Sequence, residues 1–367
     1  MHVLVGVVGA ALVLLVLAEF FVAFLLPRRV KRDPRIARQI YTVAWPVWRW
    51  VADRLPRRAR DTMLGLFGPL GLIVMLGLWA FGVVVGYACL HWAGGSKLGP
   101  GGVEVTFGND LYYSAGTFFS GTTNLAAHTT YAHVLNILEA ATGFAILFIA
   151  IGYLPALFQA FSRREVAVSQ LDPRAGSPPT AGALLLHSAG RGGWDDLDGY
   201  LEEWENWAAE VMETHLSYPV LGYFRSQHLN QNWLGALTTV LDTSAFTMVA
   251  GSEKASRTAQ LTFAIGRHAI ADLAFAFHTR TAPPSGDRLS EDALRELCEM
   301  LDEAGLELHG DGEMHAKLEE LRDTYEPYAR ALSQRLALPL SEWLPPEELE
   351  SNWQRASAQR RGRSLLP

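Results

Sequence analysis

Three long apolar runs constrain the fold of this chain more than any other feature of its sequence. They cover residues 3–26, 63–92 and 134–161, and each is long enough to cross a bilayer as a helix, which takes about 20 residues. The middle run contains no Asp, Glu, Lys or Arg, and the other two contain one acid each, Glu19 and Glu139. The sequence therefore predicts an all-α membrane protein with three transmembrane helices.

The distribution of basic residues predicts how these helices are oriented. Residues 27–62 contain eleven Lys or Arg and three Asp, and Arg163 and Arg164 follow the third run. Positive charge collects on the cytoplasmic side of membrane proteins. We therefore expect a multi-pass protein of the cell membrane, with the N-terminus outside and the basic segment and the C-terminal portion in the cytoplasm. No basic residue precedes the first run, so we interpret it as a retained anchor in the lipid bilayer rather than a secretory signal.

The basic segment also contains an aromatic stretch, TVAWPVWRWVADRLPRRAR, at residues 42–60. Tryptophan and basic side chains together are typical of a helix that lies in the membrane interface. We predict a helix along the inner face of the membrane, and the alternative is an ordinary solvated linker helix.

A short apolar stretch and a polar stretch separate the second and third runs. Asn109 or Asp110 can cap a helix that continues through the apolar residues 111–119. Nine helical residues rise only about 13 Å, too little to cross a bilayer. Residues 120–130 are too polar for lipid, and irregular backbone at membrane depth needs protein or water around it. We predict a re-entrant segment, with a pore helix at 110–119 and a return loop at 120–130; the alternative is an external amphipathic cap.

Several stretches resemble the prokaryotic potassium channels that have two spans around each pore loop. They are LYYSAGTFF, NILEAATGFAILFIAIGYLPALFQAFSRRE, LDPRAGSPP and HLSYPVLGYFRSQHLNQNWLGAL, the last two being similar to a bacterial branch with a long helical cytoplasmic domain. The resemblance covers about residues 64–179. It implies a homotetramer with one pore loop per chain, monovalent cations as the permeant ions, and a third helix that lines the pore, with Gly143 at the hinge position.

The residue patterns and the resemblance together predict five segments. In chain order they are the first transmembrane helix (1–26), the basic juxtamembrane segment (27–62), a pore module (63–161) that ends in an inner helix at 133–161, a linker (162–182) and a helical cytoplasmic domain (183–367).

The chain departs from this family at the selectivity filter. The family has T-x-G-Y-G or T-x-G-F-G, usually followed by Asp, whereas this chain has Ser120, Gly121, Thr122, Thr123, Asn124 and then Leu125. A column of filter carbonyls needs backbone angles that residues with a Cβ resist, above all β-branched Thr. We therefore expect no potassium filter. The loop either opens into a wider hydroxyl-lined path with weak selectivity, since it carries no ring of charge, or collapses and conducts nothing.

Two residues of the third run are predicted to support the loop. Glu139 is an acid at membrane depth, which marks a candidate functional position. It is expected to bond the loop backbone or a pore-helix hydroxyl, and the alternative is that it attracts cations. Gly143 is either a hinge or a site of close helix packing. His128 is the titratable residue that the sequence places in the return loop.

The C-terminal portion is predicted to be helical and without catalytic chemistry. The helices are expected at 197–212, 233–249, 260–277, 291–305, 314–338 and 341–361. It has no G-x-G-x-x-G turn after a strand, no nucleophile beside a base and no nucleic-acid footprint, so we predict no enzyme activity, no cofactor and no nucleic-acid partner. Cys89 and Cys298 have no metal-ligand spacing. His268 with Asp272, and the two histidines of 309–315, are interpreted as structural rather than as metal ligands.

The sequence thus predicts a tetrameric, potassium-channel-like ion channel with an atypical, weakly selective filter. The alternative is a non-conducting membrane receptor or scaffold, in which the tetrameric core clusters the cytoplasmic domains. A membrane-anchored enzyme is a third and weaker hypothesis.

Overall fold

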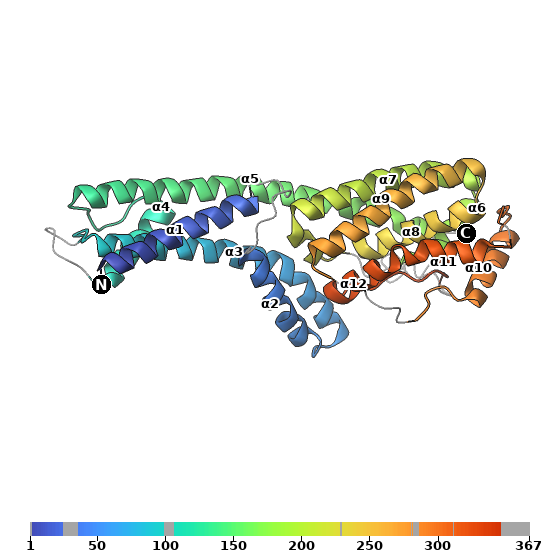
Figure 1. Ribbon diagram of the computed structural model, residues 1–367, viewed down its shortest axis with the longest axis horizontal. Coiled ribbons are helices and arrows are strands. Elements are labelled where there is room, and N and C mark those ends of the chain that lie inside the picture. The colour runs from blue at the N-terminus through green and yellow to red at the C-terminus, as the bar shows by residue number, and fades with distance from the viewer. Residues whose placement is uncertain are drawn as a thin grey trace, which may run out of the picture. The chain divides into compact units, whose positions relative to one another are not determined.

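The computed structural model describes residues 2–24, 36–98, 106–227, 230–279, 281, 286–310 and 312–345. The regular structure of these residues is helical throughout (Figure 1), as the sequence predicts. The chain divides into two compact units, Met1–Phe158 and Gln159–Pro367.

Three helices of the structure are long and apolar enough to cross a membrane. They are α1 (His2–Phe24), α3 (Arg57–Ala93) and α5 (Thr130–Ala175). The three predicted runs lie within these helices, except for residues 25 and 26, which are outside the described residues. The prediction of three membrane-compatible helices is confirmed.

The predicted linker at 162–182 is wrong for most of its length. Helix α5 continues to Ala175, and α6 (Ala181–Ala189) begins after a short turn. The prediction rested on the Pro, Gly and Ser residues of 173–182, whereas 162–172 contains no Gly or Pro and so continues the helix. The helix ends where Gly176 adopts a φ of 81°, a left-handed conformation that Gly tolerates best.

Helices α1 and α3 approach closely through small residues. A Cβ on Gly9 would lie 2.7 Å from the carbonyl oxygen of Gly86, and a Cβ on Gly86 would lie 3.1 Å from that of Gly9. Gly82 and Gly86 form a G-x-x-x-G pair on α3, and small residues at this spacing let membrane helices pack backbone to backbone. Close backbone contact at these glycines therefore holds α1 against α3.

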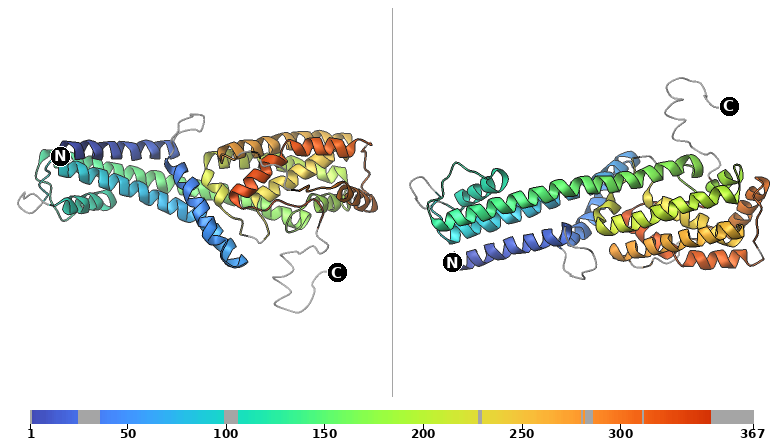
Figure 2. Two further views of the ribbon diagram at one scale, coloured as in Figure 1. Left: turned by 60° about the horizontal axis from the view of Figure 1, so that its bottom comes forward. Right: turned by 90° about the horizontal axis from the view of Figure 1, so that it is seen from above.

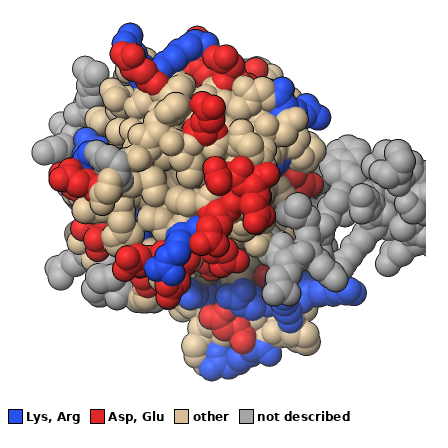
Figure 3. Space-filling view, turned by 90° about the vertical axis from the view of Figure 1, so that its right-hand side faces the viewer, with Lys and Arg blue, Asp and Glu red and all other residues tan. Residues whose placement is uncertain are grey.

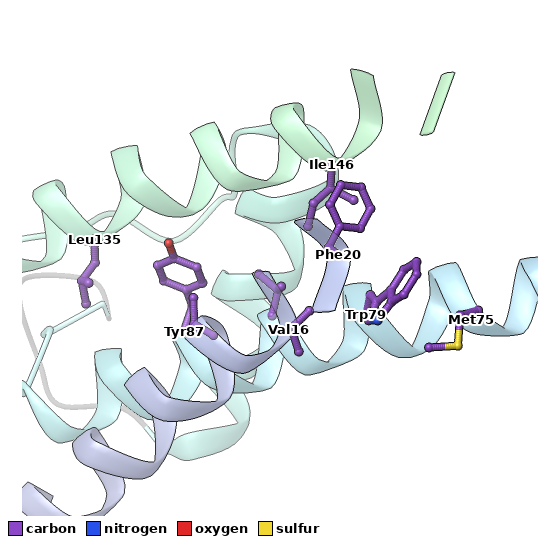
Figure 4. Close-up of a cluster of buried hydrophobic side chains, with 9 residues drawn as sticks. Val16, Phe20, Met75, Trp79, Tyr87, Leu135 and Ile146 are labelled. Carbon is purple, nitrogen blue, oxygen red and sulfur yellow. The ribbon is translucent and has the colours of Figure 1, made fainter. Parts of the chain in front are cut away.

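A cluster of buried apolar side chains joins α1, α3 and α5 (Figure 4). Phe20 of α1 packs edge-on against Trp79 of α3, with ring centroids 5.4 Å apart. Leu135 and Ile146 bring α5 into the same cluster. This packing holds the three apolar helices together as one bundle.

The predicted interfacial helix is α2 (Ile36–Ala52). Its Trp45 is buried against Phe67 of α3, with ring centroids 4.8 Å apart. The indole N–H of Trp48 donates to the carbonyl oxygen of Met63 at 2.8 Å. These contacts fix α2 against the first turns of α3, while its position relative to a membrane stays a prediction.

The second unit is a helical bundle in which α7 and α9 run side by side (Figure 2). It contains α6, α7 (Trp194–Ser217), a short 3-10 helix (Pro219–Tyr223), α8 (Trp233–Ala250), α9 (Glu253–Ala276), α10 (Glu291–Glu303), α11 (Met314–Asp323) and α12 (Glu326–Leu336). The helix expected at 314–338 is thus two helices, because the chain turns at Thr324 and Tyr325. Of the helix expected at 341–361, residues 341–345 are not helical and the rest lie outside the described residues.

A buried ionic cluster, which the sequence did not indicate, lies in the core of this bundle. Asp242 of α8 is fully buried and pairs with Arg288, which also contacts Glu326 at 3.1 Å. Tyr325 donates its hydroxyl proton to the same Asp242 carboxylate. Burial opposes the charge on Arg288, but Asp242 outweighs it and raises the pKa of the guanidinium.

Most of the acidic residues of the chain belong to the second unit. Residues 159–367 contain 31 Asp or Glu and 19 Lys or Arg, against 38 and 31 in the whole chain. The face in Figure 3 shows acidic side chains gathered over this unit, with basic ones scattered among them. The surplus of acidic residues in this unit gives it a net negative charge.

Candidate pore-loop site

The predicted pore helix is α4 (Phe107–Ser120), which packs on α3 and lies beside the start of α5 (Figure 2). It begins three residues before the predicted position, and its N-cap is Thr106 rather than Asn109 or Asp110. Asp110 is buried in the first turn, where the helix dipole favours a carboxylate. Fourteen residues rise about 21 Å, so this helix is too short to cross a bilayer.

Gly121 ends α4 and turns the chain back. Its φ is 73°, a left-handed angle, and its N–H donates to the carbonyl oxygen of Thr117 at 2.9 Å. The next residues fold against the helix. The Thr123 methyl group lies so close to Gly116 that a Cβ there would be only 2.4 Å from it. The return loop therefore starts as a tight reversal on the end of α4.

Two hydroxyl groups of the loop are bonded to nearby backbone. The Ser120 hydroxyl donates to the carbonyl oxygens of Gly116, at 2.7 Å, and Thr122, at 3.2 Å. The Thr123 hydroxyl donates to the carbonyl oxygen of Leu125 at 3.0 Å and accepts its N–H at 3.2 Å. These local bonds, typical of Ser and Thr in turns, stabilise the loop within one chain.

The backbone of the loop differs from a column of filter carbonyls. Among residues 120–130, only Gly121 has a positive φ. Thr122, Thr123 and Asn124 keep the negative φ that side chains with a Cβ favour. Thr122 and Asn124 are exposed in the single chain. The loop thus lacks the succession of positive-φ residues that a column of filter carbonyls would need.

Glu139 of α5 lies behind α4 and is fully buried. The hydroxyl of Ser114, on α4, donates to one of its carboxylate oxygens. A pore-helix hydroxyl was one of the two partners expected for this acid. The other carboxylate oxygen lies 3.6 Å from Nε2 of His91, which is on α3 and also fully buried. Glu139 therefore connects all three elements that surround the loop.

The sequence does not single out His91, which the structure places beside Ser96, Tyr113 and Glu139. Its Nδ1 is 2.8 Å from the Ser96 hydroxyl, and its ring packs edge-on against Tyr113 of α4 at 5.1 Å. The one sequence signal was a histidine inside the otherwise uncharged run 63–92. Its partners Ser96 and Glu139 are at spacings that form no motif, so only the fold brings them together.

Further polar contacts tie α5 to its neighbours on the same side. The Thr117 hydroxyl of α4 donates to the Asn136 side-chain oxygen at 3.0 Å. The hydroxyls of Tyr87, on α3, and Thr142 are 3.1 Å apart. Buried polar groups with partners hold their elements in one arrangement. The first contact joins α4 to α5, and the second joins α3 to α5.

Gly143 allows α5 to touch the backbone of α4. A Cβ at this position would lie 2.4 Å from the carbonyl oxygen of Phe118. Close packing, one of the two roles expected for Gly143, is therefore present. The hinge role stays a prediction, and α5 is a continuous helix through this residue.

Several large apolar side chains on α4 and α5 are exposed in the single chain. Phe119 at the end of α4 is 73% exposed, and Phe148 of α5 is 68% exposed. Phe144, also exposed, lies beside the loop, 3.6 Å from the Cβ position of Gly121. Large exposed apolar surfaces of this kind mark sites of contact with another subunit or with a membrane.

The residues considered for other chemistry do not form a second site. His128 is exposed in the loop. His268 and Asp272 form an exposed pair with 3.3 Å between Nε2 and the carboxylate. Among the residues that the structure describes, no group of three His, Cys, Asp or Glu could hold a metal ion. Asp311, within the 309–315 stretch, is outside these residues.

Comparison of the chain with protein-family models, with curated proteins and with solved structures finds no match. The resemblance to potassium channels stays a prediction from the residues.

Proposed function

We propose that the chain assembles as a four-fold tetramer in the cell membrane and forms an ion pathway of weak selectivity. Each chain supplies one re-entrant segment, made of α4 and the loop 121–130. Four such segments around an axis enclose a path for monovalent cations, and the second unit lies in the cytoplasm. The potassium-channel-like arrangement is retained in this proposal, and the potassium filter is not.

The observation that carries the proposal is the way α4 is held. This helix is too short to cross a bilayer, yet its inner face is buried against two membrane-length helices through Glu139, Ser114 and His91. A surface cap would not need buried polar bonds to both neighbours, because water could satisfy its polar groups. Membrane depth supplies a reason for them.

Weak selectivity follows from the loop chemistry. Hydrated cations meet hydroxyl and amide groups from Ser120, Thr122, Thr123 and Asn124, and the loop carries no ring of acidic residues. Without closely spaced carbonyls to replace water, the loop gives potassium no advantage over sodium. We therefore expect comparable flux of the two ions.

Liposome flux of the natural protein and of a loop variant tests the proposal. The variant combines Thr122→Gly, Thr123→Tyr, Asn124→Gly and Leu125→Asp, which restores the residues that a potassium filter uses. We expect the natural protein to pass potassium and sodium alike and the variant to favour potassium. A matched control, Ala126→Gly with Ala127→Gly, adds glycine to the loop outside these positions and should leave the ratio unchanged.

The mass of the detergent-solubilised protein tests the assembly. One loop per chain encloses a path only when several copies surround an axis, so a tetramer of the 40.4 kDa chain is expected. A stable monomer or dimer would remove the shared pore from the proposal.

One observation favours a second candidate, a non-conducting receptor or scaffold. The hydroxyls of Ser120 and Thr123 already bond to their own loop, so they do not need an ion or a water path. In that case the tetramer clusters the helical second units. A tetrameric protein with no flux of any monovalent cation would select this candidate over the channel.

A further inference from the structure

An apolar groove lies between α2 and the first turns of α3, away from the pore-loop site. The groove is open along its length and has a volume of about 730 Å³. The side chains that line it are almost all aliphatic or aromatic: Gln39, Ile40, Val43, Ala44, Val47, Trp48, Val51 and Met63.

The groove follows one face of α2 and stays open. Val43, Val47 and Val51 are spaced four residues apart, which places them on one side of a helix. Val43 is 69% exposed and Val47 is 61% exposed, although other α2 residues, such as Trp45, are fully packed on α3. The helix therefore has one apolar face against the protein and a second one without cover.

In the hairpin of α2 and α3, the turn between the helices and the first turn of α3 carry exposed cationic side chains. Arg54, Arg57 and Arg58 are exposed, and none of them pairs with a carboxylate in the part of the chain that the structure describes. By contrast, Arg49 and Arg60 both pair with Asp53. The hairpin thus presents unneutralised positive charge next to an aliphatic groove.

We propose that this groove binds an acyl chain of an anionic phospholipid whose headgroup contacts Arg54, Arg57 and Arg58. The ligand must be an amphiphile, because the groove accommodates an aliphatic chain and the adjacent arginines attract a negative charge. Trp50, 59% exposed and stacked under the Arg54 guanidinium, suits the level of lipid headgroups. Basic clusters beside a membrane helix recognise anionic lipids in this way.

The proposal commits to lipid for two reasons. An inorganic anion would need the arginines alone and would leave the aliphatic groove empty. A second copy that presented the same hairpin would bring arginines against arginines, because the described carboxylates of the hairpin, Asp53 and Asp61, already lie beside Arg60. Lipid binding at this groove does not depend on whether the pore conducts.

Native mass spectrometry of the full-length protein in detergent tests the proposal. Phosphatidylglycerol and phosphatidylcholine with identical acyl chains are added to delipidated protein, and the bound lipid is counted per subunit. We expect phosphatidylglycerol to bind at least tenfold more tightly, because each arginine near a headgroup is worth about fivefold in affinity.

Two variants separate the charge from the groove. Arg54→Gln with Arg57→Gln and Arg58→Gln should lose the preference for phosphatidylglycerol. Ala44→Trp fills the groove and should weaken binding of both lipids about tenfold or more. Thr42→Trp, an exposed α2 residue outside the groove, is the matched control for bulk. Arg191→Gln with Arg267→Gln and Arg295→Gln, on the second unit, is the matched control for charge.

The outcomes are distinct. Equal binding of the two lipids by the natural protein would overturn the proposal, and so would phosphatidylglycerol binding that survives Ala44→Trp. A change in subunit number caused by Ala44→Trp, with lipid binding unchanged, would show that the groove is a contact between copies and would also overturn it.

Discussion

Adding one methyl group at Gly143 tests whether α4 is held against α5 as the structure describes. In Gly143→Ala the new Cβ would lie 2.4 Å from the carbonyl oxygen of Phe118, about 1 Å closer than ordinary contact. The obstacle is backbone, so the two helices must separate. Overpacking of this kind costs about 1–3 kcal/mol of unfolding free energy.

Gly152→Ala is the matched control, because it lies in the same helix and its Cβ would have no atom within 4 Å. Both variants gain up to about 1 kcal/mol from the replacement of glycine in a helix, so this gain cancels between them. Gly143→Ala should therefore be less stable than Gly152→Ala by about 1–3 kcal/mol. Equilibrium unfolding in mixed detergent micelles measures the difference. Equal stability of the two variants would refute the close contact of α4 with α5.

Three further substitutions test other contacts. Glu139→Ala should destabilise the protein by about 1–3 kcal/mol in the same unfolding assay, because it leaves buried partners unpaired, whereas Glu139→Gln should recover much of this loss by accepting the α4 hydroxyl. Asp242→Ala should cost about 3–5 kcal/mol, since it leaves Arg288 buried without its main partner, and a loss under 1 kcal/mol would contradict the burial of this pair. Gly86→Leu should release α1 from α3 and lower the thermal stability, while Gly77→Leu on the open face of α3 should not. The yield of an engineered cross-link between the two helices should fall in Gly86→Leu alone.

The helices of the first unit could be predicted because their signal is local. An uninterrupted apolar run needs no knowledge of neighbours to be interpreted as a membrane-length helix, and α1, α3 and α5 contain the three runs. The short helix before the polar loop was also predictable, because the apolar stretch 111–119 is too short to span a bilayer and is followed by a polar stretch. Its first residue was not, since the capping signal of Asn109 and Asp110 competes with an extended Thr106.

The supporting side chains of the loop were only half predictable. Glu139 was indicated because an acid within an apolar run is energetically costly and usually has a structural or functional role. His91 carried a weaker signal, and its bond to Ser96 and its approach to Glu139 depend on how α3 packs against α5. The cluster of Asp242, Arg288 and Tyr325 was missed for the same reason, because its members come from separate parts of the chain and meet only in the folded bundle.

The most direct test of the central claim is the reversal potential of the natural protein in a planar bilayer with potassium on one side and sodium on the other. The backbone of the loop, with Thr122, Thr123 and Asn124 at negative φ, predicts channel currents that reverse close to zero voltage. A reversal potential far toward the potassium equilibrium value would contradict the account, because it would require these residues to adopt the strained geometry of a potassium filter.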